Sequence, residues 1–152
     1  MNLIGKYFDR QIFWLNYDQF DDQLPDKDWI CLAIANNQFE TDQFDKFVRT
    51  SISRNILEFK VHGQLGEKLH DHFDETISIM EMMERHNAIE VMTTWHNEET
   101  LAKTFWQCFF VTCLPEATDF ENIKIICTDL DGVNRCDELK KYINKFESGW
   151  LP

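Results

Sequence analysis

The sequence predicts one α/β domain over residues 1–152, in which helices cover both faces of a mainly parallel sheet of four to five strands, a three-layer α/β/α arrangement. Two observations lead to this prediction. Four short apolar runs alternate with four longer segments whose apolar residues recur at the helical period. At 152 residues the chain also has the usual length of one domain, and no glycine-, proline- or serine-rich linker divides it.

The first two predicted strands are Trp29–Ala35 and Asn55–His62. The first is apolar without alternation, as is typical of a strand covered on both faces. Between them, Thr41 is expected to cap a helix whose apolar face follows the 3.6-residue period. A second apolar stripe, from Leu65 to Met83, predicts a helix of about five turns after the second strand.

The later elements are, in order, a strand over Ile89–Thr94, a helix that runs from Leu101 until Pro115 ends it, a strand over Ile123–Cys127 and a helix over Cys136–Glu147. Asn97 is expected to cap the first of these helices, with Glu98 and Glu99 in its first turn. We therefore interpret residues 95–98 as a polar junction between a buried strand and a helix.

Alternating strands and helices imply right-handed crossovers and a parallel sheet. For the four predicted strands we expect the flavodoxin-like order 2-1-3-4, with a Rossmann-like order as the other choice. Residues 1–28 are harder to interpret, because Ile12–Leu15 fits either an additional edge strand or part of a helix. Leu24–Asp28 is expected to form a turn.

The formal net charge is −12, from 27 acidic and 15 basic residues. Such a charge argues against nucleic-acid binding, which needs a basic surface, and favours a basic protein partner through long-range attraction. Eight acids but only one base lie between residues 71 and 99, namely Asp71, Asp74, Glu75, Glu81, Glu84, Glu90, Glu98, Glu99 and the base Arg85. Many solvated surfaces are acidic without binding anything, so the charge indicates a partner class only.

No targeting segment is expected at Met1–Phe20, which carries charges throughout, and the apolar stretch Thr104–Leu114 is too short for a membrane span. The five cysteines include no Cys-x-x-Cys pair. We interpret them as reduced thiols, buried in the case of Cys31 and Cys127, in a cytoplasmic protein without membrane association.

No cofactor or metal is expected. The loop Ala35–Thr41 has no glycine that would let its backbone approach a pyrophosphate, and the chain has no P-loop and no Gly-x-Ser-x-Gly sequence. His62, His70 and His72 could suggest a metal site. However, positions i and i+2 of a helix point to different faces, so a tight zinc site is not predicted.

With the order 2-1-3-4, the ends of the first and third strands would form a crevice at a topological switch point. The alternative ligand site predicted there consists of Asn36, Asn37, Trp95, His96 and Asp129, with Asn97 and Asp131 nearby. A histidine beside carboxylates could act as a general base. The competing interpretation is structural, with Trp95 packed on the rim, His96 on the surface and Asn97 only a helix cap.

Two parts of the sequence resemble known families. The segment Ile125–Val133 resembles the first motif of haloacid-dehalogenase-type phosphatases, which would make Asp129 the nucleophile and Asp131 the acid/base. Only 21 residues follow Asp131, too few for the later motifs of that family, so we interpret this match as ordinary turn chemistry. Val91–Glu98 together with Thr104–Phe110 resembles a family of small uncharacterised bacterial α/β proteins over roughly the last two-thirds of the chain. That resemblance implies a bacterial origin and carries no activity or site residues.

The sequence thus favours a non-enzymatic acidic binding protein, of the bacterial immunity or antitoxin type, that neutralises a cationic toxin domain by covering it. The expected partner-binding residues are Glu81, Glu84, Trp95, His96, Glu98, Glu99, Asp129 and Asp131. The alternative is a small-molecule-binding enzyme or sensor that uses the crevice described above. No catalytic residue is assigned, and whether the protein is an enzyme is left open, with the non-enzymatic interpretation favoured.

Overall fold

The computed structural model contains a six-stranded sheet and describes residues 1–115, 118 and 120–152. Its strands are β1 (Asn2–Tyr7), β2 (Arg10–Trp14), β3 (Trp29–Ile34), β4 (Glu58–His62), β5 (Met92–His96) and β6 (Lys124–Asp129). Their order in the sheet is β1-β2-β6-β3-β4-β5. β1 is antiparallel to β2, and all other neighbouring pairs are parallel. The fold is therefore a mixed α/β fold with a mostly parallel sheet.

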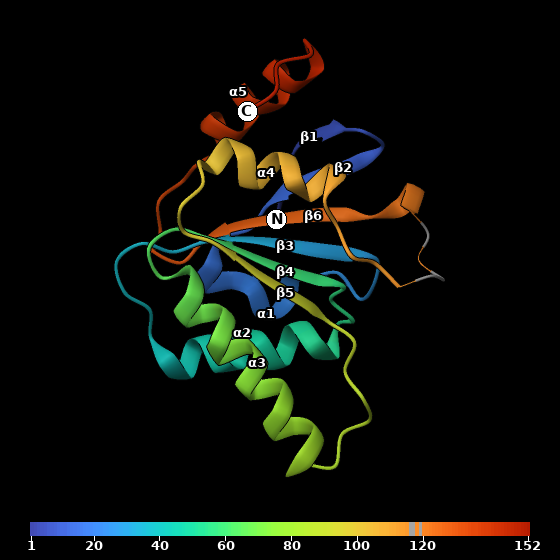
Figure 1. Cartoon of the computed structure of the whole chain (residues 1–152), viewed down its shortest axis with the longest axis vertical. Helices are drawn as coiled ribbons and strands as arrows, with labels where there is room; N and C mark the ends of the chain where they lie inside the picture. Colours follow the sequence, from blue (N-terminus) through green and yellow to red (C-terminus); the bar gives the residue numbers. More distant parts are fainter. Residues whose placement is uncertain (116–117, 119) are drawn as a thin grey trace.

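Helices lie on both sides of this sheet (Figure 1). They are α1 (Phe20–Gln23), α2 (Thr41–Ser53), α3 (Gly66–Met82), α4 (Leu101–Phe110) and α5 (Cys136–Glu147), with short 3₁₀ turns η1 (Tyr17–Gln19) and η2 (Phe120–Asn122). In the view of Figure 1, α4 and α5 lie above the sheet and α1, α2 and α3 lie below it. The sheet is thus shielded on both faces.

Two apolar clusters fill the space between the layers. One joins α1, α2 and α3 to the sheet through aromatic side chains such as Phe44, Phe59 and Phe73. The other joins α4 and α5 to the opposite face through Phe105, Phe146 and the isoleucines of the central strands. All six residues of β3 are buried, because this strand has a helical layer on each side.

The strand order corrects the flavodoxin-like prediction. The four predicted strands correspond to β3, β4, β5 and β6, and in the sheet they stand in the order 3-2-1-4, as do the first four strands of a Rossmann sheet, instead of 2-1-3-4. β4 therefore separates β3 from β5. The switch point lies between β3 and β6, because α2 leaves β3 on one side of the sheet and α5 leaves β6 on the other.

The strand count also exceeds the predicted four to five. Residues 2–14 form a hairpin, and β2, which contains most of the ambiguous Ile12–Leu15 run, lies inside the sheet while β1 forms the edge. The hairpin turn places Phe8 and Asp9 at positive φ (47° and 60°). A second strand before β3 was not predicted because the period-2 signal in this short segment is weak.

Several predicted boundaries are shifted. β5 continues through Trp95 and His96, which were expected in the junction, and α4 is capped by Thr100 instead of Asn97. The cap of α2 is Glu40, whose carboxylate accepts hydrogen bonds from the backbone of Asp42 and Gln43. α5 has the predicted bounds.

Helix α4 ends at Phe110, well before Pro115, so Cys113 lies beyond it and is exposed. All five cysteines are free thiols, and Cys31, Cys108 and Cys127 are buried. The predicted burial of Cys31 and Cys127 in apolar strands is confirmed.

Candidate functional site

The loops that follow β6, β3, β4 and β5 lie along the carboxyl edge of the sheet, where ligand sites of α/β proteins are usually found. Asp131 joins the first two loops, because its carboxylate accepts hydrogen bonds from the backbone N–H groups of Asn36 (2.9 Å) and Asn37 (3.2 Å). Asp129 is buried and pairs with Arg135 at 2.6 Å. Both acids of the Asp-x-Asp-Gly segment therefore have structural partners within the chain.

The predicted ligand site is only partly assembled. The structure brings Asn36 and Asn37 close to the loop of Asp129 and Asp131. Trp95 and His96 lie two strands away from β3, on β5. A single crevice lined by all five predicted residues does not exist, because β4 occupies the position that the predicted order gave to β5.

A cavity of about 400 Å³ lies on the other side of β6, between the loops that follow β2 and β6. Its lining includes Asn16, Tyr17, Asp131 and Gly132. This cavity was not predicted, since residues 1–28 had no assigned place in the sheet. This hollow is polar, and Trp95 and His96 take no part in it.

β5 is the opposite edge of the sheet, and its side chains alternate between two faces. Thr93 and Trp95 point to the side of α3, where they contact Asp74 and His70. Met92, Thr94 and His96 point to the side of α4. These two faces carry different chemistry.

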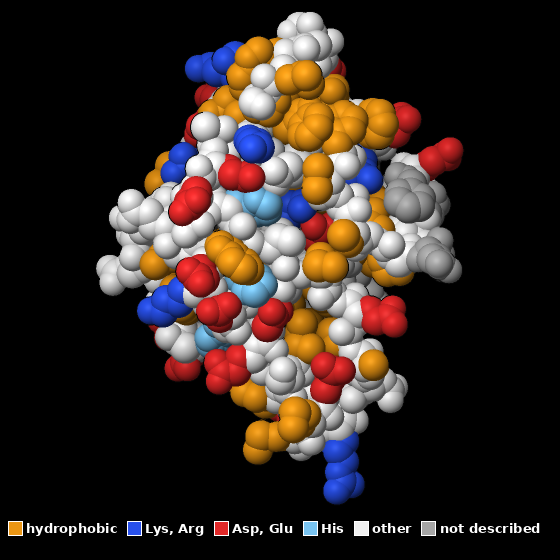
Figure 2. Space-filling model, in the orientation of Figure 1, with side chains coloured by type: hydrophobic (Ala, Val, Ile, Leu, Met, Phe, Trp, Pro, Cys, Tyr) orange, Lys and Arg blue, Asp and Glu red, His pale blue; other side chains and the backbone are white. Residues whose placement is uncertain are grey.

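The α3 side is acidic and open. α3 presents a row of four carboxylates at helical spacing beside β5, which we call the acidic ridge: Glu67, Asp71, Asp74 and Glu81. The side chains of Asp71 and Asp74 are 69% and 50% exposed. Figure 2 shows acidic side chains gathered over α3 on this face, around histidines.

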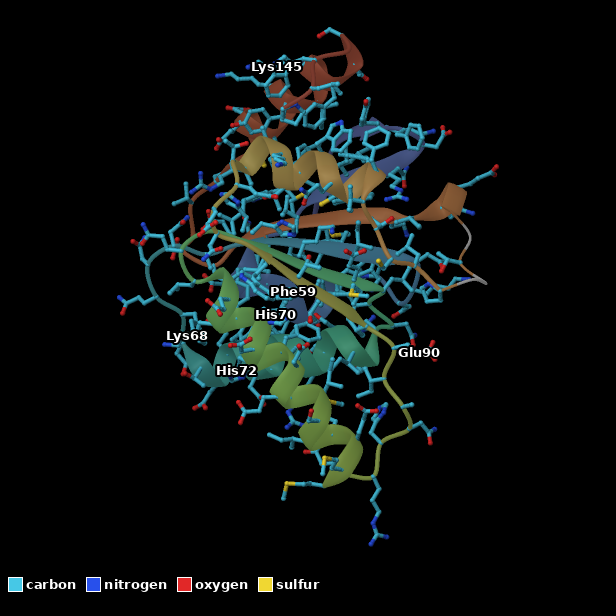
Figure 3. All side chains as sticks on the ribbon, viewed as in Figure 1. Phe59, Lys68, His70, His72, Glu90 and Lys145 are labelled. Atoms are coloured by element: carbon cyan, nitrogen blue, oxygen red, sulfur yellow. The ribbon has the colours of Figure 1, made fainter. Side chains whose placement is uncertain are left out.

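Trp95 lies next to the acidic ridge and is 44% exposed. Its ring centre is 4.5 Å from that of His70, which comes from the part of α3 beside β5 and is labelled in Figure 3. His70 Nδ1 is 2.9 Å from Asp71, and its Nε2 is 3.4 Å from Asp74. This side of β5 therefore combines an exposed aromatic ring with exposed carboxylates.

The α4 side holds a connected polar network. Thr94 Oγ1 is 2.9 Å from His96 Nε2, and His96 Nδ1 is 3.0 Å from Glu99 Oε2. Gln107 Nε2 donates to the same Glu99 oxygen at 3.0 Å, and Lys103 Nζ lies 3.7 Å from the other one. The Glu99 carboxylate therefore has several partners within the chain.

Two more pairs extend this network under α4. Lys60 Nζ is 2.7 Å from Glu58 Oε1, and their side chains are only 2% and 1% exposed. His62 Nδ1 is 3.2 Å from Thr104 Oγ1 on α4. Because Lys60 pairs in register with Thr94, and His62 with His96, the buried pairs lie beside the Thr94–His96–Glu99 group.

The protonation states follow from this packing. Burial lowers the pKa of His96 below its ordinary 6.5; the hydrogen bond to Glu99 opposes this effect, and the positive charge of Lys60 adds to it. Burial also lowers the pKa of His62, and nearby His96 lowers it further. Burial alone would raise the pKa of Glu99, but its hydrogen bond with His96 and nearby positive charge lower it overall. At neutral pH the network holds neutral imidazoles and a charged carboxylate.

The eight predicted partner-binding residues are thus divided among several places. Trp95 and Glu81 lie at the α3 side, and Glu98 is exposed in the turn after β5. His96 and Glu99 belong to the network on the α4 side. Glu84 is held by Arg49 at 2.8 Å, while Asp129 and Asp131 lie at the switch point.

The sequence did not single out Asp71, Asp74, Thr94 or Lys60 as site residues. For Thr94 a signal exists in hindsight: Thr-x-His within a strand places both side chains on one face. For the acidic ridge the signal is the spacing of acids along the outer face of α3. No signal in the sequence identifies Lys60 as a buried residue, because a lysine is rarely buried unless it is paired.

Among the described residues, none of the helices is both long and apolar enough to cross a bilayer. Within the same part of the chain, no group of three or more histidine, cysteine, aspartate or glutamate side chains could hold a metal ion.

Comparison with known proteins gives one match. No curated protein and no solved structure matches the chain significantly. A family model described as "Domain of unknown function (DUF7684)" matches residues 12–146, from within β2 to within α5. The chain therefore belongs to the DUF7684 family.

Proposed function

We propose that this protein binds a basic protein partner and covers part of its surface, in the manner of a bacterial immunity or antitoxin protein that neutralises a cationic toxin domain in the cytoplasm. The observation that carries the proposal is the exposed Trp95 beside the acidic ridge. Tryptophan is frequent among the residues that dominate binding energy at protein interfaces. Carboxylates around such an anchor attract and orient a cationic partner.

The charge of the whole chain supports the same proposal. A net charge of −12 on 152 residues produces a negative field that speeds association with a basic protein. The carboxylates of the ridge remain accessible, because Asp71 and Asp74 are at least half exposed. By contrast, Glu84, Glu99 and Asp129 are paired with cations within the chain, so the proposed interface is centred on α3 and β5.

The test uses a basic protein encoded beside this gene, mixed with the purified chain and analysed by gel filtration and calorimetry. We expect a complex that is weakened by Trp95→Ala and by Asp71→Lys with Asp74→Lys. The matched control carries Asp137→Lys with Glu147→Lys on exposed positions of α5, and changes the net charge equally. The proposal fails if no complex forms, or if the α5 variant weakens it as much as the α3 variant.

A further inference from the structure

The α4 side of β5 carries an arrangement that binding of a basic protein does not require. Thr94, His96 and Glu99 form a hydrogen-bonded series in which a hydroxyl meets one imidazole nitrogen and a carboxylate meets the other. We propose that these three residues form an acyl-transfer site in which Thr94 is the nucleophile and the substrates are esters of short acyl groups. Such triads are recognised by their geometry and roles, whatever their order in the chain.

The Glu99 carboxylate determines which imidazole nitrogen carries the proton. A carboxylate only accepts hydrogen bonds, so His96 Nδ1 donates to Glu99 Oε2 over 3.0 Å. The Nε2 lone pair then faces Thr94 Oγ1 at 2.9 Å and accepts its hydroxyl proton. This is the orientation that a general base needs in order to activate a hydroxyl.

The surroundings hold this orientation. Gln107 donates to the same Glu99 oxygen, and Lys103 lies near the other, so the carboxylate is fixed from the α4 side. The groups with charge or a titratable proton that face His96 are Glu58, Lys60 and His62 from β4, and Glu99 with Lys103 from the start of α4. Burial together with Lys60 keeps the imidazole neutral and able to accept a proton.

The reaction proceeds in two balanced steps. In the first, Thr94 Oγ bonds to the acyl carbon while its proton moves to His96 Nε2; the bond to the leaving alcohol breaks, and that oxygen takes the proton from Nε2. In the second, water attacks the acyl-threonine, passes a proton to Nε2, and Thr94 Oγ leaves with that proton as the free acid is released.

The position of β5 gives a substrate access to Thr94. β5 is an edge strand of the sheet (Figure 1), and α4 packs over β3 and β4. Thr94 is only half-buried, so a substrate can approach it from the side of β5 that has no neighbouring strand. A short acyl group such as acetyl can reach a hydroxyl at such an edge without a deep pocket.

The test uses p-nitrophenyl acetate and the whole chain. We expect p-nitrophenol release together with a protein species heavier by one acetyl group, which peptide mapping assigns to Thr94. Thr94→Val removes the hydroxyl, and we expect the rate to fall by about 100-fold or more. His96→Asn and Glu99→Gln are expected to lower the rate in the same direction.

Two variants control for structure. Thr93→Val changes the neighbouring threonine on the α3 side and is expected to keep the wild-type rate. Thr94→Ser keeps the hydroxyl and is expected to keep acyl transfer, even if Thr94→Val proves unstable by thermal unfolding. Acetyl groups found on lysines such as Lys103 but not on residue 94, or equal rates for the Val and Ser variants at this position, would overturn the proposal.

Discussion

The carboxylates that lie beside the two faces of strand β5 differ in their exposure and in the groups that they contact. On the α3 side, Asp71 and Asp74 are exposed and contact His70 and Thr93 at the surface. On the α4 side, Glu58 is buried against Lys60, and Glu99 is shared by His96, Lys103 and Gln107. Both sets lie beside the β5 edge of the sheet, but on opposite faces: Asp71 and Asp74 come from α3, whereas Glu58 comes from β4 and Glu99 from the turn before α4.

This difference matters because the contribution of an ion pair to stability depends on how exposed its charges are. Exposed ion pairs contribute little to stability, so their carboxylates can exchange an internal contact for one with a partner at small cost. A buried charge needs its partner, since an unpaired ion in the interior is strongly unfavourable. The α3 side is thus suited to binding another protein, and the α4 side to holding groups in fixed geometry.

The largest effect is expected from the buried pair. Lys60→Met leaves the Glu58 side chain buried without its ion-pair partner, and should lower the free energy of unfolding by about 3–5 kcal/mol. Lys60→Met combined with Glu58→Gln should recover part of this loss, because the buried carboxylate is removed and the amide oxygen can still accept from the backbone N–H of Cys113. The recovery is partial because the buried Arg10 loses the nearby negative charge of Glu58. Urea unfolding measures both variants.

The matched change on the other face is Asp71→Ala, which removes the contact between the exposed Asp71 carboxylate and His70. Its cost should stay below about 1 kcal/mol. Equal losses for Lys60→Met and Asp71→Ala would contradict the distinction between the two faces.

The next largest effect is expected on partner binding, which should depend on the α3 side of β5 and not on the α4 side. Trp95→Ala should weaken the complex with the basic partner by about 2 kcal/mol, roughly 30-fold in Kd, because an exposed aromatic anchor is lost. Thr94→Val, one residue away on the opposite face, should leave the affinity unchanged. Titration calorimetry measures the Kd of both variants. If Thr94→Val weakens the complex, the interface is not confined to the α3 side, and the proposed interface is contradicted.

A smaller effect is expected at the turn that leads into α4 and positions Glu99. Thr100 Oγ1 accepts a hydrogen bond from the backbone N–H of Lys103, so Thr100→Ala should cost about 1 kcal/mol. Asn97→Ala should cost less than about 0.5 kcal/mol, since Asn97 lies outside the cap. Thermal unfolding of the two variants decides which residue begins the helix.

The local elements could be predicted because helical and strand periods are properties of short segments. The bounds of α5 and the stripe of α3 follow from their own residues. Strand order depends on contacts between distant segments, and there the prediction failed. One signal was present: Met92–His96 carries polar side chains on both faces, as edge strands do, whereas Lys124–Asp129 has an apolar centre that suits the middle of a sheet.

The candidate sites show the same limit. Trp95 and His96 were identified as residues of interest from their place at a strand end. That they point to opposite faces depends on β5 continuing through His96, two residues beyond the predicted Thr94. Glu99 contacts His96 because residues before Thr100 form a turn. The prediction instead placed Glu99 in the first turn of a helix capped by Asn97. A shift of a few residues in one boundary therefore changed the composition of both sites.

The pH dependence of stability offers the last test of the α4 side. Burial lowers the pKa of His62 and His96 below the ordinary 6.5 that applies in the unfolded chain, so the folded state favours the neutral imidazoles. Their contribution to stability is fully present above pH 6.5, and it is lost as the pH falls below 6.5 and through the lower pKa values of the folded state, because the unfolded chain binds protons first. Urea unfolding between pH 5 and 8 measures this loss. His96→Asn should flatten the dependence of the unfolding free energy on pH. The control His70→Asn, on the α3 side, should leave the contribution of His62 and His96 in place. If His96→Asn leaves the pH dependence unchanged, the network does not hold this imidazole neutral.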